Sequence, residues 1–61
     1  MDRNSQFLKI YANLPLSQRS EIIVVLDDEE LTWNAAKIEV ANNTKKGKEI
    51  LGKLVKLGIL K

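Results

Sequence analysis

The stretch NNTKKGKEILGKLVKLGIL, residues 42–60, carries the clearest structural pattern in this 61-residue chain. When residues are placed about 100° apart around a helix axis, its apolar positions gather on one side and its charged positions on the other. The apolar side holds Gly47, Ile50, Leu51, Leu54 and Leu57. Thr44 is a suitable N-terminal cap, and Gly58 is a suitable end. The pattern therefore predicts an amphipathic helix over residues 45–57.

Two glycines fall inside this predicted helix, and each costs about 1 kcal/mol relative to alanine. Gly47 lies on the apolar side, where the absence of a side chain would let a second helix come close. Gly52 lies among the lysines. Packing gives no reason for a glycine there, although the backbone of a ligand could approach it.

The rest of the chain predicts three further helices. The spacing of Phe7, Ile10, Tyr11 and Leu14 favours a helix over residues 5–14, which Pro15 would end. A scaffold helix is expected over residues 15–27. A third helix, over residues 33–42, has apolar residues on two sides, as is typical of a helix packed between neighbours. The expected fold is all-α: a small helical bundle with three to four helices in a single domain, residues 1–61.

Residues 22–26, with the sequence IIVVL, leave one alternative open. A run of β-branched residues would also form a buried strand. We favour a helix because the preceding SQRSE carries no turn signal that would start a strand. The acidic residues 27–30 would then end that helix, since negative charge opposes the dipole at a helix C-terminus. A strand here would remove the predicted scaffold helix.

Composition restricts the chemistry that the chain can perform. It contains no Cys and no His, which excludes disulfides, Cys/His zinc sites, and catalysis by a Cys nucleophile or a His base. We therefore expect no enzyme activity, no cofactor and no metal. No apolar run approaches the roughly 20 residues of a membrane span, and the first residues lack a signal-peptide pattern. The expected location is cytoplasmic, without a membrane partner.

Charge is distributed unevenly along the chain. Residues 45–61 carry six lysines and one glutamate, a net charge of +5. Residues 1–44 carry four basic and seven acidic residues, a net charge of −3. Such asymmetry indicates either an anionic partner or pairing between the two halves of the chain. The acidic run at residues 27–30 is expected to be a solvated turn that can pair with lysines.

The segment LTWNAAKIEVANNTKKGKEILGKLVKLGIL, residues 31–60, resembles the helix–turn–recognition-helix segment of the winged-helix branch of the helix-turn-helix DNA-binding superfamily. Ala36 and Val40 match the buried positions of the first helix. Leu51, Leu54 and the LGIL ending match the leucine-rich end of the second. The resemblance covers about half of the chain, and the wing is missing or minimal.

The resemblance implies that the chain binds duplex DNA, largely through lysine–phosphate contacts from its last helix, and implies a role in transcriptional regulation. The residues implied to contact nucleic acid are Thr44, Lys45, Lys46, Lys48, Glu49, Lys53 and Lys56. The alternative is a protein–protein interaction module or homodimerising adaptor of the same fold, whose lysines are solvated. Phe7, Tyr11 and Ile38 are the candidate interface residues for a homodimer or a protein partner.

Overall fold

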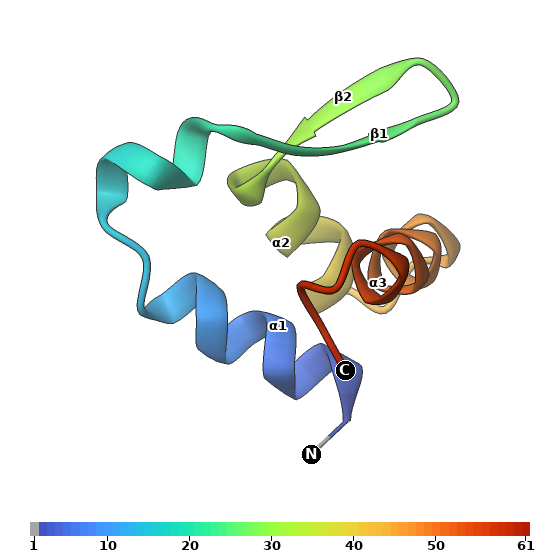
Figure 1. The fold of residues 1–61 in the computed structure, drawn as a ribbon, viewed down its shortest axis with the longest axis horizontal. Coiled ribbons are helices and arrows are strands. Elements are labelled where there is room, and N and C mark those ends of the chain that lie inside the picture. Colours follow the sequence, from blue (N-terminus) through green and yellow to red (C-terminus); the bar gives the residue numbers. More distant parts are fainter. Residues whose placement is uncertain (1) are drawn as a thin grey trace.

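A computed structural model describes residues 2–61, which form three α-helices, one short 3-10 helix and a two-stranded antiparallel sheet (Figure 1). The elements in chain order are α1 (Arg3–Ala12), η1 (Leu16–Ser20), β1 (Ile22–Leu26), β2 (Glu29–Thr32), α2 (Trp33–Ala41) and α3 (Lys45–Lys56). The expectation of an all-α bundle is therefore wrong, because the fold combines helices with a β-hairpin.

The predicted scaffold helix over residues 15–27 accounts for this error. The structure has η1 and β1 in its place. β-branched side chains favour an extended backbone, and β2 supplies the hydrogen-bonding partner. The two residues between the strands, Asp27 and Asp28, both have positive φ, at 48° and 67°. Positive φ at both central positions is typical of a tight two-residue hairpin turn of type I′.

The helices begin where side chains cap them. The Asp2 carboxylate accepts a hydrogen bond from the backbone N–H of Ser5 at 2.7 Å. With Asp2 as its cap, α1 begins at Arg3, two residues before the start of the helix predicted over residues 5–14. That hydrogen bond holds the pKa of the Asp2 carboxyl below its ordinary value. Thr32 caps α2 in the same manner through the N–H of Ala35. Helix α3 ends at Lys56, one residue before the expected end.

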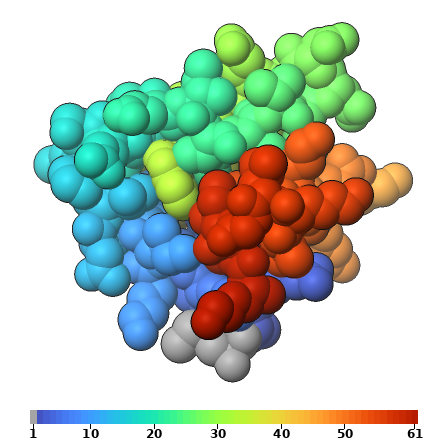
Figure 2. All heavy atoms as spheres, viewed as in Figure 1, coloured from blue at the N-terminus to red at the C-terminus, as the bar shows by residue number. Residues whose placement is uncertain are grey.

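The core of residues 2–61 lies where the three helices meet the inner face of the hairpin, with α2 at the centre (Figure 1). The phenyl ring of Phe7 is fully buried and lies 5.6 Å from the ring of Trp33, centroid to centroid. The buried apolar residues are Phe7, Val24, Leu31, Ala36, Val40, Ile50, Leu51, Leu54 and Leu60. The end of α3 and the residues after it pack beside β1 (Figure 2).

Helices α2 and α3 are joined by a three-residue turn, residues 42–44, in which Asn43 has a positive φ of 55°. The two helices pack directly on each other, and Gly47 lies at their closest approach. The expectation that Gly47 lets a second helix come close is confirmed. This packing fixes which side of α3 faces solvent, and that side is the candidate site.

Candidate nucleic-acid interface

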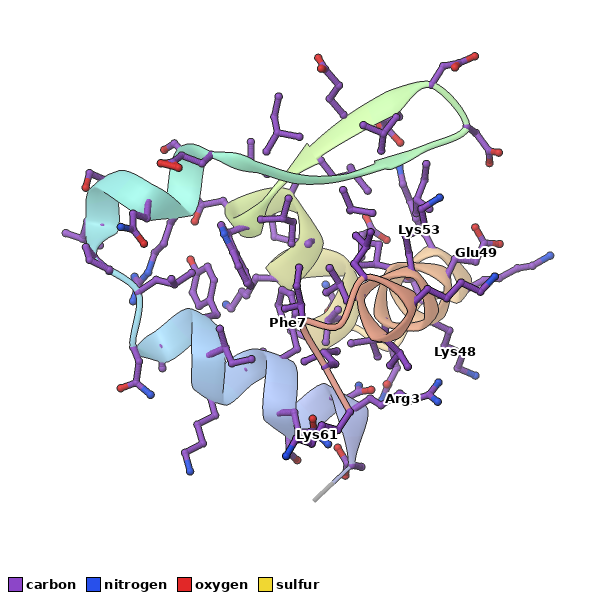
Figure 3. The ribbon with its side chains drawn as sticks, viewed as in Figure 1. Arg3, Phe7, Lys48, Glu49, Lys53 and Lys61 are labelled. Carbon is purple, nitrogen blue, oxygen red and sulfur yellow. The ribbon has the colours of Figure 1, made fainter. Side chains whose placement is uncertain are left out.

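Helix α3 turns one side to the core and the other to solvent. Its buried residues are Gly47, Ile50, Leu51 and Leu54. On the opposite side lies a surface that we call the lysine face, made up of Lys45, Lys48, Glu49, Gly52, Lys53 and Lys56. In Figure 3, which looks roughly along α3, Lys53 and Lys48 project to opposite sides of the helix, with Glu49 between them. The charged side chains of this face are all exposed.

Thr44 belonged to the predicted contact residues, but its hydroxyl is engaged within the chain. The Oγ1 atom accepts a hydrogen bond from the N–H of Gly47 at 2.9 Å and donates one to Oε1 of Glu39 at 2.6 Å. This is the N-terminal cap expected from the sequence, and it also ties α3 to α2. Thr44 therefore fixes the start of the lysine face and lies outside it.

Lys46 also belonged to the predicted contact residues, and it points toward the hairpin. Its ammonium group forms a salt bridge with the Glu29 carboxylate on β2, which raises the pKa of Lys46 through the hydrogen bond. Within residues 2–61 this is the single ion pair between side chains. Pairing between the acidic and basic halves of the chain thus occurs, but it engages one lysine of α3.

The hairpin tip and the first turn of α3 border an open hollow of about 410 Å³. Its lining residues are Leu26, Asp27, Glu29, Lys45, Lys46 and Glu49. The lining holds three carboxylates and two ammonium groups, so the positive charge of α3 is offset at this end of the helix. The unbalanced positive charge lies at Lys48, which projects to the other side of the helix from Lys53, and further along the helix at Lys53 and Lys56. No group of three or more potential metal ligands occurs in the described part of the chain.

The ends of the chain carry two basic residues outside the predicted site, Arg3 and Lys61. Arg3 on α1 and Lys48 on α3 project toward the same edge of the molecule (Figure 3). The backbone N–H of Lys61 donates a hydrogen bond to Oε1 of Gln6 at 3.2 Å, so the C-terminal residue is held against α1. Arg3 lies far from α3 in the sequence, so no local pattern indicated that the packing of α1 on α3 would turn Arg3 and Lys48 toward the same edge.

The three candidate interface residues have different environments. Phe7 is fully buried in the core, so its side chain offers no exposed surface to a partner. The hydroxyl of Tyr11 donates a hydrogen bond to Oδ1 of Asn34 at 2.7 Å, and the Arg19 guanidinium lies 4.4 Å from the ring centroid. Tyr11 is thus held by contacts within the chain. Ile38 is 57% exposed on α2, and its role at an interface stays a prediction.

Comparisons of this chain with protein-family models, with curated proteins and with solved structures gave no significant match. Within residues 2–61, each helix is too short or too polar to cross a lipid bilayer. A functional assignment therefore depends on the lysine face and on the exposed apolar side chains themselves.

Proposed function

We propose that this chain binds duplex DNA, largely through lysine–phosphate contacts from the exposed side of α3, and that α2, the turn and α3 act as a helix-turn-helix. The observation that carries this proposal is that four lysines of the lysine face are free to contact an anion. All four are exposed, and none forms an ion pair with another side chain in the described residues: Lys45, Lys48, Lys53 and Lys56. Unpaired ammonium groups on one side of a helix complement the repeating negative charge of a phosphate backbone.

The chemistry of this face favours contacts to phosphates over contacts to base edges. Lysine presents a compact charge on a flexible stem, whereas base pairs are usually distinguished by arginine, asparagine or glutamine. Helix α3 contains none of these three residue types. We therefore expect binding with little sequence preference. Three to four phosphate contacts correspond to a slope of about −3 to −4 in a plot of log K against log salt concentration.

The acidic hairpin restricts how a duplex can approach. Asp27, Asp28 and Glu30 are exposed at or beside the tip, which borders the first turn of α3. Their carboxylates would repel phosphates at that end of the helix. The duplex is therefore expected to contact Lys48, which projects away from the hairpin, together with Lys53 and Lys56 in the later turns of α3, and to leave Lys45 near its edge.

The proposal is tested by titrating the isotope-labelled protein with a mixed-sequence duplex, first at about 50 mM and then at about 200 mM salt. We expect amide shifts at residues 48–56 that weaken as salt is added. Lys53→Gln should weaken binding and reduce the salt slope by about 0.9. Lys9→Gln is the matched control, because it removes the same charge from an exposed position on α1. Unmoved resonances at the lower salt concentration would overturn the proposal.

Protein–protein interaction is the second candidate function, and the exposure of apolar side chains favours it. Ile38 on α2 is 57% exposed, and Ile22 and Val25 on β1 are 52% and 47% exposed. Such residues lose contact with water when a partner covers them. If this function holds, sedimentation velocity will show self-association that Ile38→Ser abolishes, and the amide spectrum will not respond to duplex DNA.

A further inference from the structure

Gly52 is the glycine of α3 that the fold itself does not explain. Glycine in a helix interior lowers helix stability relative to alanine. The same cost at Gly47 is explained by the backbone of α2, which leaves no room for a side chain. At Gly52 an added β-carbon would meet no atom within 4 Å, and the residue has an ordinary helical backbone. Packing and backbone conformation would therefore both accept alanine at this position.

Two lysines of α3 lie close to Gly52 on the helix surface. Residues four positions apart lie on the same side of a helix. Lys48 and Lys56 therefore flank Gly52 on its two sides along the axis, about 12 Å apart at their backbones. Neither lysine forms an ion pair with another side chain in residues 2–61. The result is a gap in the helix surface between two free ammonium groups.

The acidic neighbour of Gly52 lies toward the hairpin. Glu49 lines the hollow together with Lys45 and Lys46. Viewed along α3, Glu49 lies between Lys53 and Lys48, and Lys48 projects away from the hairpin (Figure 3). Around the helix, Glu49 borders the gap at Gly52 on the side of the hairpin. On the side of Lys48, no acidic residue of α3 borders it.

We propose that one sugar–phosphate strand of the duplex crosses α3 at Gly52, between Lys48 and Lys56. This inference rests on the proposed function, because it names the crossing point within the lysine face. The absence of a side chain lets a phosphate approach the helix backbone closely. At that distance the two lysines reach the strand from opposite sides. A side chain at position 52 would hold the strand away and lengthen both contacts.

The inference is tested with Gly52→Ala and Gly52→Gln, and Ala12→Gln serves as the control. Alanine and glutamine both favour a helix over glycine, so the two variants should fold and unfold at a higher denaturant concentration than wild type. Ala12 is exposed at the end of α1, and its replacement enlarges a neutral side chain away from α3. Binding to a mixed-sequence duplex is measured by fluorescence anisotropy across a series of salt concentrations.

We expect Gly52→Gln to weaken binding on the order of tenfold and to reduce the salt slope by about 1 to 2, the value of one or two lost phosphate contacts. Gly52→Ala should weaken binding by a smaller factor, and Ala12→Gln should leave it unchanged. Binding of both Gly52 variants at wild-type strength, or equal weakening by Ala12→Gln, would overturn the crossing point and leave DNA binding itself intact. Absence of binding by the wild-type protein would overturn both.

Discussion

A β-carbon added to Gly47 in α3 would lie 2.5 Å from the backbone oxygen of Glu39 in α2. The neighbouring atoms on the α2 side belong to the backbone and cannot rotate away. The same Glu39 oxygen accepts a hydrogen bond from the N–H of Thr44 at 3.2 Å, which anchors the turn between the helices. The crossing of α2 and α3, and with it the orientation of the lysine face, therefore depends on a glycine at position 47.

Gly47→Ala should lower the free energy of unfolding by about 1–3 kcal/mol, because the added methyl group forces the two helices apart. Gly52→Ala is the matched variant, since it adds the same group to the same helix without meeting any atom. It should raise the free energy of unfolding by about 0.5–1 kcal/mol. Urea unfolding followed by circular dichroism measures both. Stabilisation by Gly47→Ala would contradict the close packing of α2 on α3.

Phe7→Leu should lower the free energy of unfolding by about 1–2 kcal/mol, because the fully buried phenyl ring fills the core against Trp33. The fluorescence of Trp33 in the folded protein should also change, since its aromatic neighbour is lost. Ile38→Ala is the control at an exposed position and should change stability by less than about 0.5 kcal/mol. A Phe7→Leu variant as stable as wild type would show that Phe7 is not a core residue.

The sequence predicted those parts of the fold that depend on neighbours along one helix. The 3.6-residue period separated the buried and exposed sides of α3, and the apolar position of Gly47 pointed to a close helix crossing. Both features are local, since each follows from side chains one or two turns apart. The exposure of Lys45, Lys48, Lys53 and Lys56 follows from the same period.

The errors concern features that depend on distant partners. β1 is stabilised by pairing with β2, and the turn between them uses two aspartates in place of the Asn-Gly or Asp-Gly that usually signals such a hairpin. Phe7 is buried because α2 and the end of the chain cover α1. The sequence indicated that the acidic run at residues 27–30 can pair with lysines, and Glu29 does pair with Lys46, 17 residues away. Which lysine of α3 takes part depends on how the hairpin packs beside that helix. None of these contacts has a short-range pattern.

Asp28→Gly should raise the free energy of unfolding by about 0.5–1 kcal/mol, because glycine adopts the positive φ of 67° at this position without steric cost. Asp28→Asn separates this effect from the loss of charge, since asparagine also tolerates the left-handed region but is neutral. Asp28→Ala should be destabilising. Thermal unfolding of the three variants provides the comparison. A stabilising alanine would mean that the turn does not hold this residue at positive φ.

Glu29→Gln should lower the pKa of Lys46 toward its ordinary value of 10.5, because the carboxylate that raises it through a hydrogen bond is replaced by a neutral amide. The raised pKa also fixes the sign of a pH effect on stability. The salt bridge contributes fully below pH 10.5, and its contribution is lost as pH rises through the higher pKa of Lys46 in the folded protein. The titration is followed through the Cε resonance of Lys46.

Glu30→Gln is the control for that titration, because it removes the same charge from the next residue of β2, which forms no salt bridge with Lys46. The wild-type protein should lose stability above pH 10.5 more steeply than Glu29→Gln does. Equal pKa changes in the two variants would mean that Lys46 senses the general charge of the hairpin and not a bond to Glu29. In that case Lys46 would be free to join the lysine face, and its replacement by glutamine should weaken DNA binding as much as Lys53→Gln.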